Sequence, residues 1–313
     1  MATVLITGGA GFIGSCLADR LLQDESMHVV LVDNLSTGKK YYANPSPRCT
    51  FITADANSTV DMAAIFGRFQ FDYVFHYAAV VGVQRTLANP ALVLKDIDGF
   101  RNVLDLSKNT GVKRVFFSSS SEVYGESVEY PQNEVTTPLN SRLPYAIVKN
   151  VGEAYFQSYQ TEFDLDFTIF RFFNTYGARQ SDDFVVARFV HAALKDEDIT
   201  VYGAGDQTRT FCYIQDNVDA CYNALAQDQF VNDVVNVGSE KETTILELAQ
   251  IVIKLCDSKS SIVHLPELPE GDMKRRLPDA SRMKTLLGRQ HTSLDEGLKC
   301  VIASALSRHS EVR

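Results

Sequence analysis

A glycine-rich turn directly after the first predicted strand is the feature that most constrains the fold of this chain. The apolar run Thr3–Thr7 leads into Gly8-Gly9-Ala10-Gly11-Phe12-Ile13-Gly14, and a helical pattern continues through Leu22. Glycines permit the tight turn and let the backbone approach a pyrophosphate, while the start of the helix offers free N–H groups and a favourable dipole. Because the turn stands between a strand and a helix, it predicts a dinucleotide-binding site. The simpler alternative is a strand–turn–helix connection without a ligand.

Acidic residues after the next two predicted strands bear on the identity of the dinucleotide. Asp33 ends the second strand, 22 residues after Gly11. A carboxylate there accepts a hydrogen bond from a ribose 2′-hydroxyl and repels a 2′-phosphate, so NAD is favoured over NADP. Lys39 and Lys40 would favour a phosphate, but a solvated loop explains them more simply. Asp55, just after the third strand, is placed to contact an adenine, although a surface turn explains it almost equally well.

Short apolar runs alternate with helical patterns through the first half of the chain. Further strands are expected at 28–33, 50–54, 72–76, 112–118 and 166–171, and helices at 61–66, 98–108 and 144–161. Continuous apolar strands separated by helices are typical of a parallel sheet that is covered on both faces. The predicted fold class is therefore α/β, with a Rossmann-type doubly wound parallel sheet.

Beyond residue 172 the alternation becomes less regular. Helices are expected at 185–194, 214–226 and 244–255, with short strands at 200–202, 210–214 and 234–237. This pattern indicates a smaller α/β substrate-binding domain beside the sheet. We therefore expect an NAD-binding domain at 1–171 and a substrate domain at 172–313, with a soft and interleaved boundary, because no linker rich in Gly, Pro or Ser separates them.

The composition excludes several classes of protein. The 313 residues carry a net charge of −9, which argues against a nucleic-acid partner because a phosphate backbone needs a basic surface. Six scattered cysteines without a CxxC pair indicate free thiols in a reducing cytoplasm. The N-terminus lacks the basic region of a signal peptide, and no uncharged apolar stretch reaches the roughly 18 residues of a membrane span. The histidines have no metal-ligand spacing, and His76 is expected to be packed in the core.

Two polar segments are candidates for catalysis. Tyr145 and Lys149 lie four residues apart on one face of a predicted helix. An ammonium near a phenol favours the phenolate, so we expect a lowered pKa for Tyr145 and a role as general base toward an alcohol. The segment Ser118-Ser119-Ser120-Ser121-Glu122-Val123-Tyr124-Gly125 follows the fifth strand, at the sheet edge where ligands bind. Taken alone, the first pattern is also that of a surface helix and the second that of a Ser-rich loop.

Together these motifs resemble the extended short-chain dehydrogenase/reductase family, in its NAD-dependent sugar-nucleotide epimerase/dehydratase branch. The resemblance runs from Thr7 to about Gly297. It implies that Ser120 is the catalytic hydroxyl, Tyr145 the base and Lys149 its partner at the nicotinamide ribose, with Ser121 and Glu122 beside them. It further implies a cofactor site made by Gly8, Gly11, Phe12, Ile13, Gly14, Asp33, Asn34, Asp55, Ala56, Tyr77, Ala78, Ala79, Ser118, Tyr145, Lys149 and Phe172.

Three later segments resemble the part of the family that binds the substrate. They are Arg171-Phe172-Phe173-Asn174-Thr175-Tyr176-Gly177, Gln207-Thr208-Arg209-Thr210-Phe211 and Arg275-Arg276-Leu277-Pro278-Asp279. The resemblance implies a nucleotide-sugar substrate, with Asn174 and Arg209 at its diphosphate. Arg276, Arg142 and Val201 complete the expected substrate site. Members of the family are commonly homodimers through a four-helix interface, which here would use residues 98–108 and 144–161.

The reaction implied by the resemblance begins with oxidation of the sugar at C4. Tyr145 removes the hydroxyl proton while hydride passes to NAD⁺, and the 4-keto sugar then undergoes a second step. Glu122, in Ser121-Glu122-Val123-Tyr124-Gly125, is similar to its counterpart in UDP-glucuronate decarboxylases and indicates proton transfer, as in decarboxylation or dehydration. Ser120 and the segment Ala79-Val80-Val81-Gly82-Val83-Gln84 are more similar to UDP-sugar 4-epimerases, which stay the alternative. Ser121 stands where hexose 4,6-dehydratases have Asp, and Asp96 stands where the family usually has Asn.

Two further alternatives belong to other classes of protein. One is a non-catalytic NAD(H)-binding regulator on the same fold, since fold alone does not determine function. The other is a reductase that exchanges NAD freely with solvent.

Overall fold

The core of the fold is a seven-stranded sheet in which every neighbouring pair of strands is parallel. The computed structural model describes residues 1–267 and 275–311. The strand order is β11-β6-β5-β4-β1-β2-β3. Its strands are β1 (Ala2–Thr7), β2 (Met27–Asp33), β3 (Cys49–Thr53), β4 (Tyr73–His76), β5 (Arg114–Ser120), β6 (Asp166–Phe172) and β11 (Asp233–Val237). The predicted doubly wound sheet is confirmed.

The order of the strands reverses between β1 and β4. The chain first moves outward from β1 to β2 and β3, then returns to place β4 on the other side of β1. In an open α/β sheet, ligands bind at the carboxyl edge beside such a reversal, because the two connecting loops separate there. The turn after β1 and the loop after β4 are therefore the expected walls of a site.

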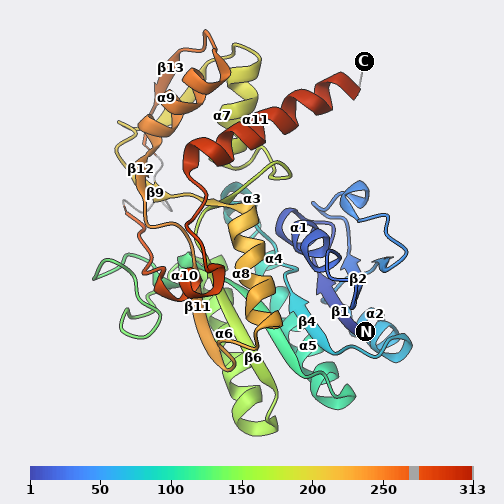
Figure 1. The fold of residues 1–313 in the computed structure, drawn as a ribbon. Coiled ribbons are helices and arrows are strands. Elements are labelled where there is room, and N and C mark those ends of the chain that lie inside the picture. Colours follow the sequence, from blue (N-terminus) through green and yellow to red (C-terminus); the bar gives the residue numbers. More distant parts are fainter. Residues whose placement is uncertain (268–274, 312–313) are drawn as a thin grey trace.

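Helices cover both faces of this sheet (Figure 1). One face packs against α1 (Phe12–Leu21), α8 (Ile214–Ala226) and α10 (Ser281–Leu287), which bury Leu17, Val218 and Met283. The other face packs against α2 (Thr59–Arg68), α5 (Asp96–Thr110) and α6 (Pro144–Phe163), which bury Met62, Val103 and Phe156. Because both faces are covered, buried residues do not alternate with exposed ones along the central strands; all seven residues of β5 are buried, its three serines included.

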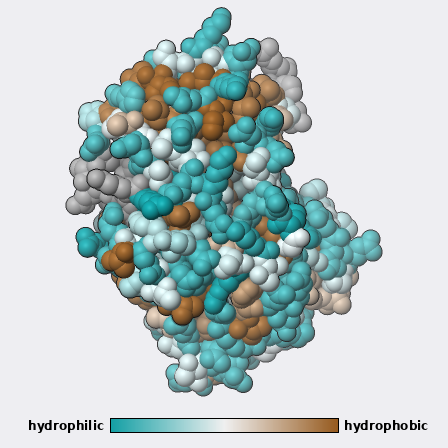
Figure 2. Space-filling view, turned by 60° about the vertical axis from the view of Figure 1, so that its left-hand side comes forward, coloured by the Kyte–Doolittle hydropathy of each residue, from teal (hydrophilic) through white to brown (hydrophobic). Residues whose placement is uncertain are grey.

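A second, smaller core lies at the carboxyl end of the chain, in the upper part of Figure 1. It is formed by α7 (Val185–Leu194), α9 (Ile245–Cys256) and α11 (Leu294–Glu311). Three two-stranded sheets accompany these helices. They pair β13 (Ile262–Leu265) with β8 (Ile199–Tyr202), β12 (Glu242–Thr244) with β9 (Thr208–Thr210), and β10 (Cys212–Tyr213) with β7 (Thr175–Tyr176). On the face shown in Figure 2, hydrophobic residues gather over this upper part, and the lower part is mainly hydrophilic.

Several elements differ from the sequence-based prediction. The strand expected at 210–214 is split into β9 and β10, which pair with different partners. Strand β11 and helices α8 and α10 belong to the second half of the chain and pack on the large sheet, in the region where the sequence analysis expects an interleaved boundary. Short helices at η1 (Lys40–Tyr42), α3 (Val83–Ala88), α4 (Pro90–Leu94) and η2 (Ser121–Tyr124) lie where no helix is expected. No helix in the described part of the chain is both long and apolar enough to span a membrane.

Candidate active site

The glycine turn folds tightly between β1 and α1 and lies against the loop after β4. Gly8 has a φ of +70°, and a Cβ built on it would lie 2.8 Å from the backbone nitrogen of Ala78. The N–H of Gly11 donates to the carbonyl of Gly8 at 3.0 Å, and a Cβ on Gly14 would collide with that same carbonyl. Helix α1 begins after Gly11 without a side-chain cap, and its first residues, Phe12, Ile13 and Gly14, line the cavity described below. This cradle fits a pyrophosphate.

Asp33 lies at the end of β2, next to the glycine turn. Its side chain is only 8 % exposed, and its two oxygens accept hydrogen bonds from the N–H groups of Ala10 (3.0 Å) and Leu35 (2.8 Å). These bonds fix the carboxylate beside the glycine turn, where the sequence predicts recognition of a ribose. Lys39 and Lys40 belong to the loop that follows, and the ammonium of Lys39 lies 5.9 Å from the ring centroids of Tyr41 and Tyr42.

The ends of β1 and β4 are joined by side-chain hydrogen bonds. The hydroxyl of Thr7 accepts from the N–H groups of Tyr77 and Ala78, each at 3.2 Å, and lies 2.8 Å from Nδ1 of His76. Burial, together with the charge of Lys149, lowers the pKa of His76 to about 3. The imidazole is therefore neutral and packed against Phe117, which confirms the prediction of a core histidine.

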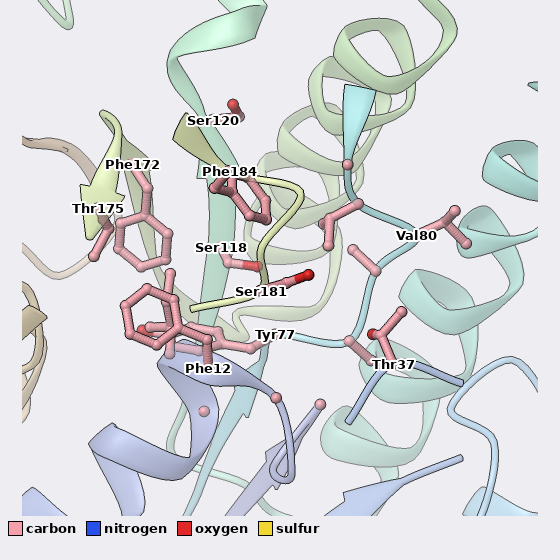
Figure 3. Close-up of a pocket in the computed structure, with 18 of the residues that line it drawn as sticks. Phe12, Thr37, Tyr77, Val80, Ser118, Ser120, Phe172, Thr175, Ser181 and Phe184 are labelled. Atoms are coloured by element: carbon pink, nitrogen blue, oxygen red, sulfur yellow. The ribbon is translucent and has the colours of Figure 1, made fainter. Parts of the chain in front are cut away.

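These elements surround one cavity of about 620 Å³ at the carboxyl edge of the sheet (Figure 3). Phe12 from α1, Tyr77 from the loop after β4 and Phe172 from the end of β6 gather around it. All sixteen residues of the expected cofactor site line this cavity: Gly8, Gly11, Phe12, Ile13, Gly14, Asp33, Asn34, Asp55, Ala56, Tyr77, Ala78, Ala79, Ser118, Tyr145, Lys149 and Phe172. A dinucleotide is a large ligand, and a cavity of this volume that includes the glycine cradle suits it.

Lys149 lies beneath the cavity, on α6, and is 2 % exposed. Its Nζ donates to the carbonyl of Ser118 at 2.6 Å and lies 3.4 Å from the Ser118 hydroxyl. The same ammonium is 5.8 Å from the ring centroid of Tyr145, one turn earlier on the helix. Burial lowers the pKa of Lys149 to about 8, although the carboxylates of Asp96 and Glu153 oppose this shift. At neutral pH most of the Lys149 side chains are therefore charged, but the pKa lies only about one pH unit above neutrality.

The pKa of Tyr145 differs from the sequence-based expectation. We expected a lowered pKa because of the ammonium four residues away, and this was wrong. Burial raises the pKa of the phenol well above its usual range, and the negative charge of Glu122 raises it further. A hydrogen bond with Ser120 and the charge of Arg276 act in the opposite direction but are weaker. The protein alone thus holds Tyr145 protonated.

Glu122 and Arg276 form an ion pair at the wall of the cavity. Nη2 of Arg276 lies 2.6 Å from Oε1 of Glu122, and Nη1 lies 3.5 Å from the hydroxyl of Ser121. All three side chains line the cavity. Oε2 of Glu122 and Nε of Arg276 are buried and have no hydrogen-bond partner among the described residues. A buried polar atom without a partner costs free energy, so a polar ligand in the cavity would be stabilised by contacts with these two atoms.

The other expected substrate residues are more dispersed. Asn174 lines the cavity, with a φ of +34° and an Nδ2 that donates to the carbonyl of Thr210 at 3.2 Å. Arg209 is buried on β9, where its Nη1 donates to the carbonyl of Thr208 at 2.7 Å, and it does not line the cavity. Val201 is fully buried in the second core, and Arg142 is exposed just before α6. The structure thus brings Asn174 and Arg276 to the cavity and leaves these other three away from it.

Some lining residues were not predicted. They come from the segment after β2 that ends in η1, from the start of α5, from the connection between β7 and α7, and from α7 itself, and include Ser36, Thr37, Lys39, Tyr42, Asp96, Arg179, Gln180, Phe184 and His191. The loop after β2 could have been inferred, because carboxyl ends of parallel strands share one edge. The connection before α7 has no motif of its own. Within the described ranges, no three His, Cys, Asp or Glu side chains gather closely enough to hold a metal ion.

Comparisons with known proteins agree with this geometry. A model of the NAD dependent epimerase/dehydratase family matches residues 4–238. Among curated proteins, UDP-N-acetyl-alpha-D-glucosaminuronate decarboxylase of Bacillus cytotoxicus is 38% identical over 315 residues, which cover 94% of this chain and 95% of that protein.

Solved structures with the same fold cover nearly the whole chain. UDP-glucose 4-epimerase of Thermotoga maritima, solved with UDP-glucose, has a TM-score of 0.92 at 33% identity, over 98% of this chain and 99% of that one. A mutant of UDP-glucuronic acid 4-epimerase of Bacillus cereus, solved with a fluorinated UDP-glucuronic acid and NAD, has a TM-score of 0.90 at 28% identity, with the same coverage.

Proposed function

The chain belongs to the NAD dependent epimerase/dehydratase family, and from this premise we propose that it oxidises C4 of a UDP-linked hexuronate and then releases the carboxyl group on C5 as CO₂. The observation that carries this proposal is the ion pair of Glu122 and Arg276, 2.6 Å apart in the wall of the cavity. An arginine is suited to the substrate carboxylate, and a neighbouring glutamate is suited to proton transfer at C5. UDP-glucuronate and its 2-acetamido analogue are the candidate substrates.

The residues of the glycine cradle and Asp33 would hold NAD. We propose that the cradle binds the pyrophosphate, that Asp33 binds the adenosine ribose, and that Lys149 binds the nicotinamide ribose. When bound, NAD⁺ supplies a positive charge and a hydride acceptor for C4, and the hydride returns to the sugar at the end. We also propose that residues 1–171 form the NAD-binding part and residues 172–313 the substrate part, with β11, α8 and α10 interleaved.

Tyr145 is the proposed base for the first step. Its phenol is hydrogen-bonded with Ser120, which places both hydroxyls where a substrate hydroxyl can join them. The nearby ammonium of Lys149 stabilises the phenolate, whereas burial and Glu122 oppose it. Tyr145 therefore takes the C4 hydroxyl proton only in the loaded site, where positive charge is added. Without bound NAD⁺, Tyr145 is expected to stay protonated and unable to act as a base.

The second step follows from the chemistry of the oxidised sugar. With a ketone at C4, the carboxylate on C5 belongs to a β-keto acid. The C5–C6 bond breaks, its electron pair moves into an enolate across C4 and C5, and CO₂ leaves. Glu122, ionised in its pair with Arg276, is proposed to take up a proton from solvent after CO₂ leaves and to pass it to C5, where the C4–C5 enolate accepts it. Arg276 is the proposed residue that holds the carboxylate before it leaves.

A second candidate is 4-epimerisation of a UDP-sugar. Two observations favour it: Ser120 at the catalytic hydroxyl, and structural neighbours that are themselves 4-epimerases. This reaction needs the keto sugar to turn over between oxidation and reduction, and no proton moves at C5. Glu122 would then have no chemical role.

Product analysis distinguishes the two candidates. The purified protein is incubated with NAD⁺ and either UDP-glucuronate or UDP-N-acetylglucosaminuronate, and products are identified by mass spectrometry. We expect a UDP-sugar that has lost CO₂. An isomer of unchanged mass would establish the epimerase instead, and NAD lost during gel filtration together with net NADH formation would favour a freely exchanging dehydrogenase or reductase. No turnover despite bound NAD(H) would favour the regulator.

Two proposals concern assembly and location. We propose a homodimer through the outer faces of α5 and α6, where Ile147 and Phe163 are each 42% exposed. We also propose a cytoplasmic location, because all six cysteines are free thiols.

A further inference from the structure

Asp96, the first residue of α5, lies in the wall of the cavity and is 5 % exposed. Its Oδ2 accepts a hydrogen bond from the backbone N–H of Val80 at 2.8 Å, and its Oδ1 lies 3.5 Å from Nδ2 of Asn57. Val80 follows β4 and Asn57 follows β3, and both line the cavity. One carboxylate therefore joins two loops of the proposed cofactor site.

The beginning of α5 is packed closely onto these loops. A Cβ on Gly99 would lie 2.6 Å from Oδ1 of Asn57, so the helix cannot move nearer. One turn further, Nδ2 of Asn102 donates to the carbonyl of Ala56 at 3.0 Å. Because the helix is fixed to the loop after β3, the position of Asp96 is fixed as well, and with it the N–H of Val80.

The charges that face Lys149 come from three elements. Glu153 belongs to the same helix, α6, and is held by Arg171, whose Nη2 and Nε lie 2.7 and 3.0 Å from its two oxygens. His76 on β4 is neutral near pH 7, because its pKa is lowered to about 3. Asp96 on α5 has no arginine or lysine ion-pair partner among the described residues. Both carboxylates favour the charged lysine, but Glu153 shares its charge with Arg171.

We propose that Asp96 is a positioning residue of this active site: its carboxylate holds the Ala78–Val80 segment in place and supplies the counter-charge that keeps the buried ammonium of Lys149 protonated. The proposal rests on the proposed role of Lys149. Burial raises the pKa of Asp96 itself, and Asp55 nearby raises it further, but the Val80 N–H, Lys149 and Asn57 favour the ionised form.

The test is a titration of Lys149 itself, which needs no substrate and no turnover. Lysine is labelled with ¹³C at Cε, the Lys149 signal is assigned from its loss in Lys149→Gln, and its chemical shift is followed against pH. In the parent protein we expect a midpoint of about 8. In Asp96→Asn, which keeps an acceptor for Val80 but removes the charge, the midpoint should fall by roughly one pH unit. An unchanged midpoint overturns the proposal.

Asp98→Asn is the matched control, because Asp98 lies in the same first turn of α5 but is exposed and does not line the cavity. It should leave the midpoint in place; an equal shift in both variants would mean that the effect is not specific to Asp96. A second measurement on the unchanged protein covers the case in which Asp96→Asn does not fold. The backbone amide signal of Val80 should titrate with Asp96, at a pH above the usual aspartate range. If the Val80 signal does not change with pH, the proposed role of this hydrogen bond is wrong.

The outcome is separate from that of the proposed function. If neither UDP-hexuronate is decarboxylated but the Lys149 midpoint shifts in Asp96→Asn, the positioning role of Asp96 is supported and the proposed substrate is wrong. If decarboxylation occurs and the Lys149 midpoint does not shift, the proposed function is supported and the positioning role of Asp96 is wrong.

Discussion

Glu122 and Arg276 are 154 residues apart in the chain, yet their side chains form an ion pair of 2.6 Å in the wall of the cavity. Glu122 lies on η2, directly after β5, and Arg276 lies in the segment before α10. The large sheet and the carboxyl-terminal part of the chain thus each contribute one member. Both charges line the same cavity.

Replacing Glu122 by Gln should separate the two chemical steps. Loss of a proton donor costs on the order of 10²-fold or more in the step it serves. C4 oxidation should survive, because removal of the Glu122 charge lowers the pKa of Tyr145 toward its usual value. Single-turnover NADH absorbance measures oxidation, and CO₂ release measures the second step. Glu126→Gln, an exposed carboxylate four residues on, is the control. Equal losses in both steps would remove Glu122 as the residue that selects decarboxylation.

The rate of C4 oxidation should decline as the pH rises through about 8. The pKa of Lys149 is lowered to about 8 by burial, so its ammonium loses its proton in this range and no longer stabilises the Tyr145 phenolate. This decline is the opposite of the pH dependence expected if ionisation of Tyr145 alone controlled the rate, because the rate would then rise with pH. Stopped-flow measurement of NADH formation against pH checks this. A rate that keeps rising through that range would show that the lysine charge is not required.

Gly14→Ala should weaken NAD binding. The added Cβ would collide with the carbonyl of Gly8 and displace the turn that cradles the pyrophosphate. Strain of about 1–3 kcal/mol is typical of such overpacking, which corresponds to roughly a 5- to 150-fold rise in Kd. Isothermal titration with NAD⁺ measures it.

Gly67→Ala is the control for this substitution, because a Cβ there meets nothing within 4 Å on α2. We expect unchanged NAD affinity and a slightly higher free energy of unfolding. If the two variants bind NAD equally well, the turn does not form the pyrophosphate site.

Glu153→Ala should destabilise the protein strongly. Glu153 and Arg171 are both nearly inaccessible, 2.7 Å apart, and the hydroxyl of Ser119 also donates to Glu153, at 2.5 Å. Removing one member of a buried pair leaves the other charge without compensation, at a cost of about 3–5 kcal/mol. Glu242→Ala breaks the exposed pair with Arg275 and should cost at most about 1 kcal/mol. Urea unfolding compares the two; similar losses would contradict the account of burial.

The cofactor half of the site could be predicted from the sequence because its determinants are local. The glycine turn, Asp33 and the Tyr145–Lys149 pair each occupy a few consecutive residues or one helix face, and all of them line the cavity. The parallel sheet could be predicted for the same reason, since its strands are short apolar runs. The edge position of β11 depends on contacts with β6, about 65 residues earlier, which no local pattern encodes.

The substrate half was less accessible to sequence analysis. Arg209 and Val201 were expected near the substrate and do not line this cavity, so their roles stay predictions. The raised pKa of Tyr145 was missed because the lysine is close in sequence, whereas burial and the opposing Glu122 arise from tertiary packing. Asp96 was noticed as a departure from a pattern, but its hydrogen bond to Val80 required the fold.

Proton transfer at C5 is the central claim, and incubation in D₂O tests it most directly. Purified protein, NAD⁺ and UDP-glucuronate or UDP-N-acetylglucosaminuronate are mixed in D₂O, and the product is analysed by mass spectrometry and NMR. We expect a UDP-sugar without its carboxyl group that carries one deuterium at C5. A UDP-hexuronate epimer with its carboxyl group intact and no deuterium at C5 would contradict the proposed decarboxylation.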